Sequence, residues 1–185
     1  MTPTYTIPAL DPEAAGRVAS ALQDRLVALT DLHLTLKHIH WNVVGPTFIG
    51  VHQMLDPQVD AVRLMSDDVA ERIATLGHEP IGTPGFVVEH RTWEDYSLRR
   101  ALTHEHLAAL DLVYDGVVGD HRGLIETLDD LDLVTQDLLI EQSEQLEQFQ
   151  WFVRAHLERS DGSLRHESAT TERDAADAAG AELNP

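Results

Sequence analysis

The sequence contains no cysteine, which excludes disulfide bonds, thiolate metal sites and cysteine nucleophiles. No apolar run approaches the roughly 18 residues that a membrane-spanning helix requires. Residues 1–10 also lack the basic region and apolar stretch of a secretory signal. Together these absences favour a cytoplasmic protein that has no membrane partner.

Basic residues are scarce: 13 lysines and arginines face 32 acidic residues, for a net charge of -19, and Lys37 is the only lysine. Such a surface attracts cations and repels nucleic acids and anionic membranes. Histidine, in contrast, occurs 11 times. Imidazole and carboxylate are the usual ligands of iron, zinc and manganese, so the composition points to metal binding, although most histidines of any chain lie on its surface.

Apolar residues recur with helical periodicity in four long segments, over residues 12–39, 48–76, 97–128 and 133–158. Gly45 and Pro46 end the first segment, and Gly77 is a natural C-terminal cap for the second. Pro57 predicts a kink or a broken first turn within the second segment. Alternation typical of strands is absent throughout.

The connection between the second and third helices contains a loop rich in glycine and proline over residues 77–91. It is followed by a predicted short helix over residues 92–96. Four amphipathic helices with one long crossover predict an all-α, ferritin-like four-helix bundle, with a short extra helix in the connection between helices two and three.

At 185 residues the chain is most simply one domain. We expect an N-terminal extension over residues 1–11 and the bundle over 12–159. Residues 160–185 are rich in Ala, Ser, Thr, Asp and Glu and carry almost no large apolar groups. They predict a flexible acidic tail.

Di-iron sites inside four-helix bundles use Glu-x-x-His motifs, which place both ligands on one inward face. No glutamate in this sequence is followed by a histidine three residues later. The interior di-iron site of ordinary ferritins is therefore not expected here.

Two other pairs share a helical face at a spacing of four residues: His52 with Asp56, and Asp67 with Glu71. Each pair alone is more often a solvated surface pair than a site. His52 and Asp67 are 15 residues apart, roughly 22 Å along a helix, so no single ion can bind both. Either the pairs are unrelated, or they meet across an antiparallel two-fold dimer that crosses near Ala61 and Val62. His40 would join because only a short turn separates it from the second helix.

Two sequence runs, residues 37–52 (KHIHWNVVGPTFIGVH) and residues 67–73 (DDVAERI), resemble the two signatures of the Dps family, the DNA-binding proteins from starved cells. Their spacing also matches, and the resemblance covers residues 10–158. It implies a homododecameric shell and a ferroxidase site at the two-fold interface that holds two iron ions. His40, His52 and Asp56 would come from one subunit, and Asp67 and Glu71 from its partner.

The resemblance further implies oxidation of Fe(II), with hydrogen peroxide favoured over dioxygen, and storage of a ferric mineral. Trp41 matches a tryptophan that the family places beside its site, where it takes up a stray oxidising equivalent; an ordinary interface aromatic is the alternative. Residues 123–153 hold eight acidic residues and no lysine or arginine. Asp137 is the best candidate for the three-fold pores through which iron enters, and Asp129, Asp130 and Asp132 are weaker ones.

Dps proteins that bind DNA generally use lysine-rich tails. Here residues 160–185 hold two arginines against six acidic residues. We therefore expect no useful DNA affinity at physiological salt. The main alternative is a protein that compacts or protects DNA and lacks significant ferroxidase activity. A purely structural assembly and a haem-binding ferritin that uses Met54 and Met65 remain weaker alternatives, since methionines on an apolar stripe are usually core residues.

Overall fold

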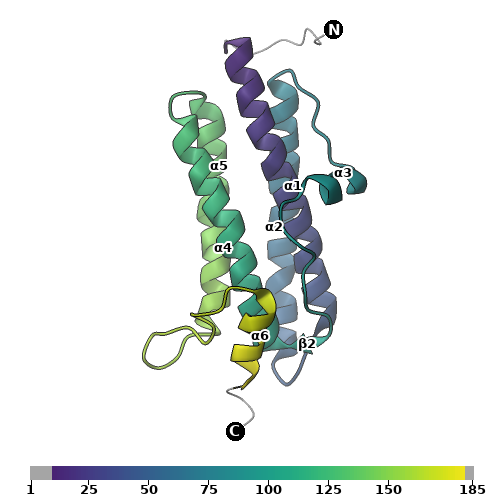
Figure 1. The fold of residues 1–185 in the computed structure, drawn as a ribbon, viewed down its shortest axis with the longest axis vertical. Helices are drawn as coiled ribbons and strands as arrows, with labels where there is room; N and C mark the ends of the chain where they lie inside the picture. Colours follow the sequence, from purple (N-terminus) through teal and green to yellow (C-terminus); the bar gives the residue numbers. More distant parts are fainter. Residues whose placement is uncertain (1–9, 182–185) are drawn as a thin grey trace.

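Four long helices form two antiparallel hairpins in a computed structural model of the chain, which describes residues 10–181 (Figure 1). Helix α1 (Pro12–Asn42) pairs with α2 (Phe48–Thr75), and α4 (Thr103–Leu128) pairs with α5 (Leu133–Ala155). A long connection joins the two hairpins and leads from the end of α2 to the start of α4. The predicted ferritin-like bundle is therefore confirmed. Within residues 10–181, no helix is long and apolar enough to cross a membrane.

Local signals in the sequence explain where α1 begins and α2 ends. The Asp11 carboxylate caps α1 by accepting hydrogen bonds from the backbone N–H groups of Glu13 and Ala14, and Pro12 follows at a position that needs no donor. Gly77 adopts a φ of 82°, as predicted for a cap, and the N–H of His78 bonds to the carbonyl of Ile73. This Schellman arrangement satisfies carbonyls that the end of α2 would otherwise leave unpaired.

Two details of the sequence prediction need correction. The short helix of the connection is α3 (Pro84–His90), and residues 92–96 are not helical. Pro84 stands in the first turn of α3, a position that suits proline. The Trp93 indole Nε1 donates to Asp31 and so ties residues 92–96 to α1. Helix α2 also continues through Pro57, so the predicted break is wrong and a kink stays a prediction.

A pair of very short strands, which the sequence pattern did not predict, joins the ends of two helices. Strand β1 (Val43–Val44) lies parallel to β2 (Ala101–Leu102), and Val43 pairs with Ala101. Because β1 follows α1 directly and β2 precedes α4 directly, this pairing fixes the turn after α1 against the start of α4.

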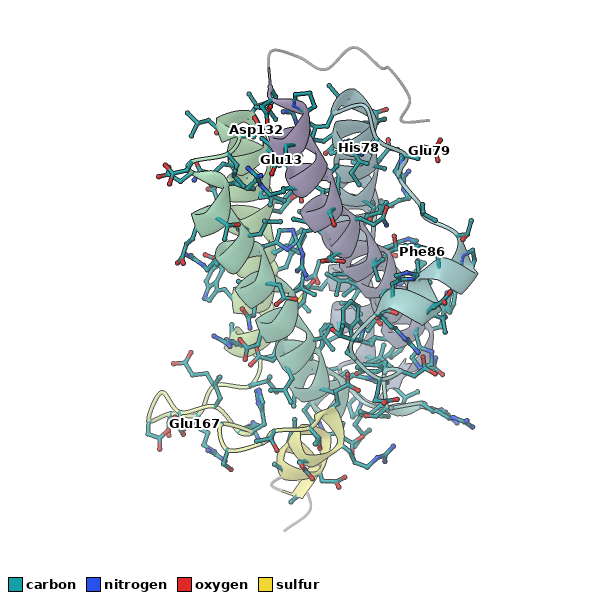
Figure 2. All side chains as sticks on the ribbon, turned by 45° about the horizontal axis from the view of Figure 1, so that its top comes forward. Glu13, His78, Glu79, Phe86, Asp132 and Glu167 are labelled. Carbon is teal, nitrogen blue, oxygen red and sulfur yellow. The ribbon has the colours of Figure 1, made fainter. Side chains whose placement is uncertain are left out.

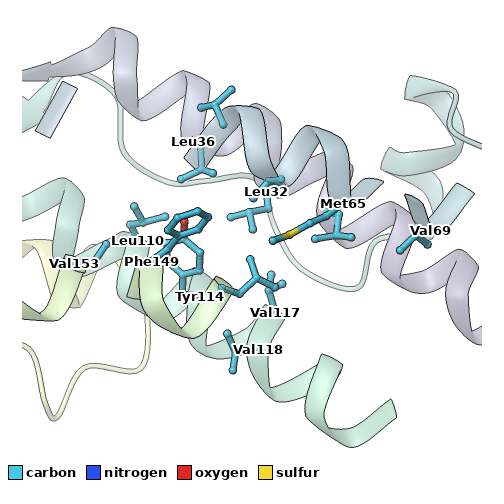
Figure 3. Close-up of a cluster of buried hydrophobic side chains, with 14 of the residues drawn as sticks. Leu32, Leu36, Met65, Val69, Leu110, Tyr114, Val117, Val118, Phe149 and Val153 are labelled. Atoms are coloured by element: carbon cyan, nitrogen blue, oxygen red, sulfur yellow. The ribbon is translucent and has the colours of Figure 1, made fainter. Parts of the chain in front are cut away.

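The hydrophobic core is formed by side chains of all four long helices, and Figure 3 shows one cluster within it. Leu32 and Leu36 of α1 and Leu110 of α4 are fully buried, and each contributes about 1.5–3 kcal/mol relative to an exposed side chain. Met65 is buried in the same core and Met54 packs at its edge, as expected for methionines on an apolar stripe. The core also contains buried polar contacts, such as the hydrogen bond that the Tyr114 hydroxyl donates to Gln58 Oε1 at 2.7 Å.

The structure gives residues 160–181 of the predicted tail a helix and buried side chains, which the composition did not suggest; the flexibility of this segment stays a prediction. Helix α6 (Glu172–Ala181) packs against the lower end of α4 in Figure 1. Its contact stripe consists of Ala175, Ala176 and Ala179, all buried. Small side chains let the two helix backbones approach closely, and this packing needs none of the large apolar groups whose absence suggested a mobile tail. Residues 1–9 and 182–185 lie outside the described part of the chain.

Candidate metal centre

The α1–α2 hairpin brings His40, His52 and Asp56 together. One potential ligand atom from each residue lies within 4.8 Å of the others. Two donors on one first-row ion, each bonded at about 2 Å, can be at most about 4 Å apart. The limit of 4.8 Å is only slightly larger, so the three side chains lie close to the spacing that a shared ion requires. Within residues 10–181, no other group of three such side chains meets the same distance limit.

The two histidines hold each other in place through reciprocal hydrogen bonds to the backbone. His40 Nδ1 donates to the carbonyl of His52 at 3.0 Å, and His52 Nδ1 donates to the carbonyl of His40 at 2.9 Å. Their rings stack with centroids 3.6 Å apart. Because a carbonyl can only accept, both protons lie on Nδ1 and both Nε2 atoms keep a lone pair. This arrangement is typical of metal-binding histidines, whose second nitrogen bonds to a backbone carbonyl.

Asp56 is the exposed member of the group, and it already has a cationic neighbour. Its Oδ1 atom lies 3.3 Å from His40 Nδ1 and 3.3 Å from the ammonium nitrogen of Lys37. The Asp56 side chain is 51% exposed, whereas His40 is buried. Lys37 did not stand out as a site residue in the sequence, although it precedes His40 by three positions and therefore shares its helical face.

Asp67 and Glu71 lie further along α2 and are exposed to solvent. Neither carboxylate forms an ion pair within residues 10–181. The distance along α2 separates them from His52 and Asp56 of the same chain, as the spacing in the sequence required. One copy of the chain therefore brings together three of the five predicted ligands, and the participation of Asp67 and Glu71 stays a prediction.

Large apolar side chains are exposed on the same hairpin. Trp41 follows His40 directly and is 70% exposed, and Leu34, Phe48, Ile49 and Leu64 are also exposed. Large apolar side chains that stay exposed on a soluble protein can mark a surface that contacts another molecule. The exposure of Trp41 fits both predicted roles, an interface aromatic and a residue beside the site.

The four predicted pore acids lie around the turn between α4 and α5, and their environments differ. Figure 2 shows Asp132 at the end of the bundle that also carries Glu13 and His78. Asp132 is buried, caps α5 and accepts a hydrogen bond from Arg72 at 2.6 Å. Burial alone would raise the pKa of Asp132, but hydrogen bonds from Thr135 and Arg72 outweigh it and hold the pKa below its usual value. Asp129, Asp130 and Asp137 are exposed, so they remain available to a pore.

Two histidines that the composition alone could not place are core residues. His106 and His121 are both fully buried, and burial lowers the pKa of each to about 4. His106 Nδ1 forms a hydrogen bond with the Tyr96 hydroxyl at 3.0 Å, and His121 Nδ1 donates to the carbonyl of Val117. Both rings are therefore neutral at physiological pH and belong to the packing of the bundle.

Known proteins similar to this chain share both its sequence and its fold. Residues 19–162 match the family described as the ferritin-like domain. The chain is 61% identical over 176 residues to the "DNA protection during starvation protein" of Mycolicibacterium smegmatis, which covers 95% of this chain and 96% of that protein. It is 48% identical over 160 residues to the "Fine tangled pili major subunit" of Haemophilus ducreyi, covering 86% of this chain and 85% of that protein. The solved structure of Mycobacterium smegmatis Dps superimposes with a TM-score of 0.90 at 61% identity and covers 92% of this chain and 97% of that one.

Proposed function

This chain belongs to the Dps family of ferritin-like proteins, and we propose that it oxidises Fe(II) and stores the ferric product inside a homo-oligomeric shell. The observation that carries the proposal is the cluster of His40, His52 and Asp56, in which both histidines are held with Nε2 available to a metal. Imidazole and carboxylate suit Fe(II), and they also accept zinc and manganese.

Iron is the substrate of the proposed reaction. Two ferrous ions each give one electron to hydrogen peroxide, the O–O bond breaks, and two hydroxide ions form. The ferric ions then hydrolyse and join the mineral in the cavity. Because both electrons pass to one peroxide molecule, no hydroxyl radical is released. We propose peroxide as the favoured oxidant and dioxygen as a slower one.

A complete site needs more ligands than one copy of the chain brings together. We propose that two copies pack with their α1–α2 hairpins antiparallel, so that Asp67 and Glu71 of the partner complete the cluster. The exposed apolar side chains of these hairpins, Trp41 among them, support such an interface. Twelve copies in a closed shell are the assembly that we propose, and cytoplasmic location is part of the same proposal.

Iron must also reach the interior of the shell. The net charge of -19 on each copy makes the assembly attractive to cations. Asp137 is the strongest pore candidate, and Asp129 and Asp130 are also exposed. Asp132 is the weakest of the four pore candidates, because its carboxylate already accepts hydrogen bonds from Arg72 and Thr135.

Anaerobic iron oxidation tests the proposal. Fe(II) is added under nitrogen to metal-free protein, peroxide follows, and ferric absorbance is recorded for the wild type, for His52→Ala and for a buffer blank. His90→Ala is the matched control, because His90 is exposed on α3, where its ring stacks on Phe86 and its Nδ1 donates to the carbonyl of Phe86. We expect fast oxidation and a soluble product for the wild type and the control. Oxidation no faster than the blank, or equal in His52→Ala, would contradict the proposal.

The name of the M. smegmatis relative supports DNA protection as a second candidate function. Removal of iron and peroxide would protect DNA without contact, and the composition of this chain favours that route. A duplex carries phosphates throughout, and binding them requires a surplus of lysine and arginine that the chain lacks. We propose no binding at physiological salt, and clear retardation of DNA in a gel shift at that ionic strength would refute this.

A further inference from the structure

A groove that the iron chemistry does not use lies between α1 and α4. It encloses about 430 Å³, within the range of pockets that bind small molecules. Its floor is apolar and is formed by Leu32 of α1 and by Leu112, Val113 and Val117 of α4. Trp93 of the connection and the residues that begin α6 form its walls.

A glycine on α4 leaves space in the groove that a side chain would otherwise occupy. Gly116 lines it, and a Cβ added there would meet no other atom within 4 Å. Glycine inside a helix costs about 0.5–1 kcal/mol relative to alanine. No close backbone approach among the described residues requires a glycine at this position. A larger side chain would therefore both strengthen α4 and reduce the groove.

The rim of the groove is acidic. Five carboxylates line it: Asp31, Glu94, Asp95, Asp120 and Glu172. Three arginines partly compensate them: Arg173 lines the groove, Arg91 pairs with Asp31 and Asp95, and Arg25 pairs with Asp120. Five carboxylates against three guanidinium groups leave an excess of negative charge. An apolar floor beneath a negative rim is complementary to a ligand with an apolar body and a cationic end.

The aromatic wall is held in a fixed orientation. The Trp93 indole Nε1 donates to Asp31 at 2.7 Å, and Arg91 bonds to the other oxygen of the same carboxylate. The indole ring therefore needs no reordering when a ligand binds, which lowers the entropy cost of binding. Indole faces also attract ammonium groups.

From these observations, we propose that this groove, lined by Leu32, Trp93, Leu112, Val113, Gly116 and Val117, binds small amphipathic organic cations of the aryl-alkyl ammonium class. The site is separate from His40, His52 and Asp56, none of which lines it. The proposal does not depend on iron oxidation.

Two probes with the same apolar body and opposite charge test the proposal: 4-phenylbutylammonium and 4-phenylbutyrate. Binding to the full-length protein is measured by calorimetry and by tryptophan fluorescence. We expect the ammonium probe to bind at least tenfold more tightly than the carboxylate probe. Equal affinities would overturn the assignment of the ligand as a cation.

Gly116→Leu and Gly119→Leu form a matched pair of variants. Both glycines lie on α4, both have open space at the Cβ position, and only Gly116 lines the groove. We expect Gly116→Leu to lose binding of the ammonium probe at least tenfold, and Gly119→Leu to bind like the wild type. Because leucine favours helices, both variants should fold. Equal binding of the ammonium probe by the wild type and both variants would overturn the proposal. Binding that occurs only after removal of residues 1–9 would also overturn it, since the groove would then be the binding site of the chain's own N-terminal segment.

Discussion

Asp111 anchors the C-terminal segment to the bundle, and its replacement by asparagine should release that segment. Asp111 on α4 is only 2% exposed and accepts hydrogen bonds from three side chains. Arg154 Nε lies 2.7 Å away, and Gln150 Nε2 and His166 Nε2 each lie 2.9 Å away. His166 is itself buried and belongs to the segment that leads to α6.

The expected cost follows from the burial of this network. Asparagine keeps the shape of aspartate but loses the charge, so the contacts of Arg154 and His166 weaken and one of them faces an amide N–H group. Disruption of a buried charged pair typically costs about 3–5 kcal/mol. Arg154 keeps a bond of 2.7 Å to Asp115, so we expect about 2–4 kcal/mol for Asp111→Asn. This cost corresponds to a roughly 30-fold or larger increase in the fraction of molecules whose C-terminal segment is detached from the bundle.

Limited trypsin digestion measures this population when the segment opens and closes faster than it is cleaved. Cleavage at Arg165 or Arg173 should accelerate by that factor in Asp111→Asn. Asp115→Asn is the matched control, because Asp115 also bonds to Arg154 and Gln150 but its side chain is 52% exposed. We expect a change of less than about 1 kcal/mol for the control. Equal cleavage rates for the two variants would refute the anchoring role of Asp111.

The remaining predictions concern metal affinity, acid stability and iron uptake. Lys37→Gln should bind Zn²⁺ severalfold more tightly in calorimetry, because the Lys37 ammonium competes for the Asp56 carboxylate; unchanged affinity would contradict this. Stability should fall as pH drops from about 6.5 towards 4, because the unfolded chain then binds protons at positions 106 and 121 while the folded pKa of each histidine is about 4. Each histidine contributes at most about 3 kcal/mol to this loss, so thermal melts of His121→Gln should show a weaker pH dependence than the wild type. Asp137→Asn should slow iron uptake without loss of stability, whereas Asp132→Asn should lower the melting temperature, since it breaks the bond from Arg72; the reverse pattern would exchange their roles.

Periodicity and caps predicted most of the fold. The four long helices, the cap at Gly77 and the core of leucine, valine and methionine side chains all follow from local patterns that the structure retains. A short helix in the connection was also predicted, but its position and the two short strands were not, because tertiary contacts decide them. Residues 92–96 were predicted to be helical, yet they form bends and irregular backbone, and the bond from Trp93 to Asp31 ties them to α1.

The C-terminal helix shows a limit of composition as a guide to order. Residues 160–185 lack large apolar groups, which normally predicts disorder. Here the alanine stripe of α6 packs on α4, and the polar contacts of His166 and Glu172 add specific anchors. No local pattern in the sequence predicts that His166 will form a hydrogen bond with the buried Asp111 of α4.

The proposed site shows what spacing can and cannot establish. A separation of four residues placed His52 and Asp56 on one face, and the short turn placed His40 beside them, as the structure has it. The reciprocal backbone bonds of the two histidines, and the ion pair of Lys37, depend on the three-dimensional path of the turn. Whether Asp67 and Glu71 of a second copy complete the site depends on an assembly that one chain does not contain.

Mixed assemblies of two inactive variants test the shared site most directly. His52→Ala removes a ligand from one half of the proposed site, and Glu71→Ala removes a ligand from the other half. If the site is shared, a dimer with one copy of each variant contains one doubly altered site and one site with no alteration. Co-refolded protein should then recover a substantial part of the peroxide-dependent Fe(II) oxidation that each variant alone lacks. Assembly without any recovery, or full activity in Glu71→Ala alone, would contradict a ferroxidase site built from two copies of this chain.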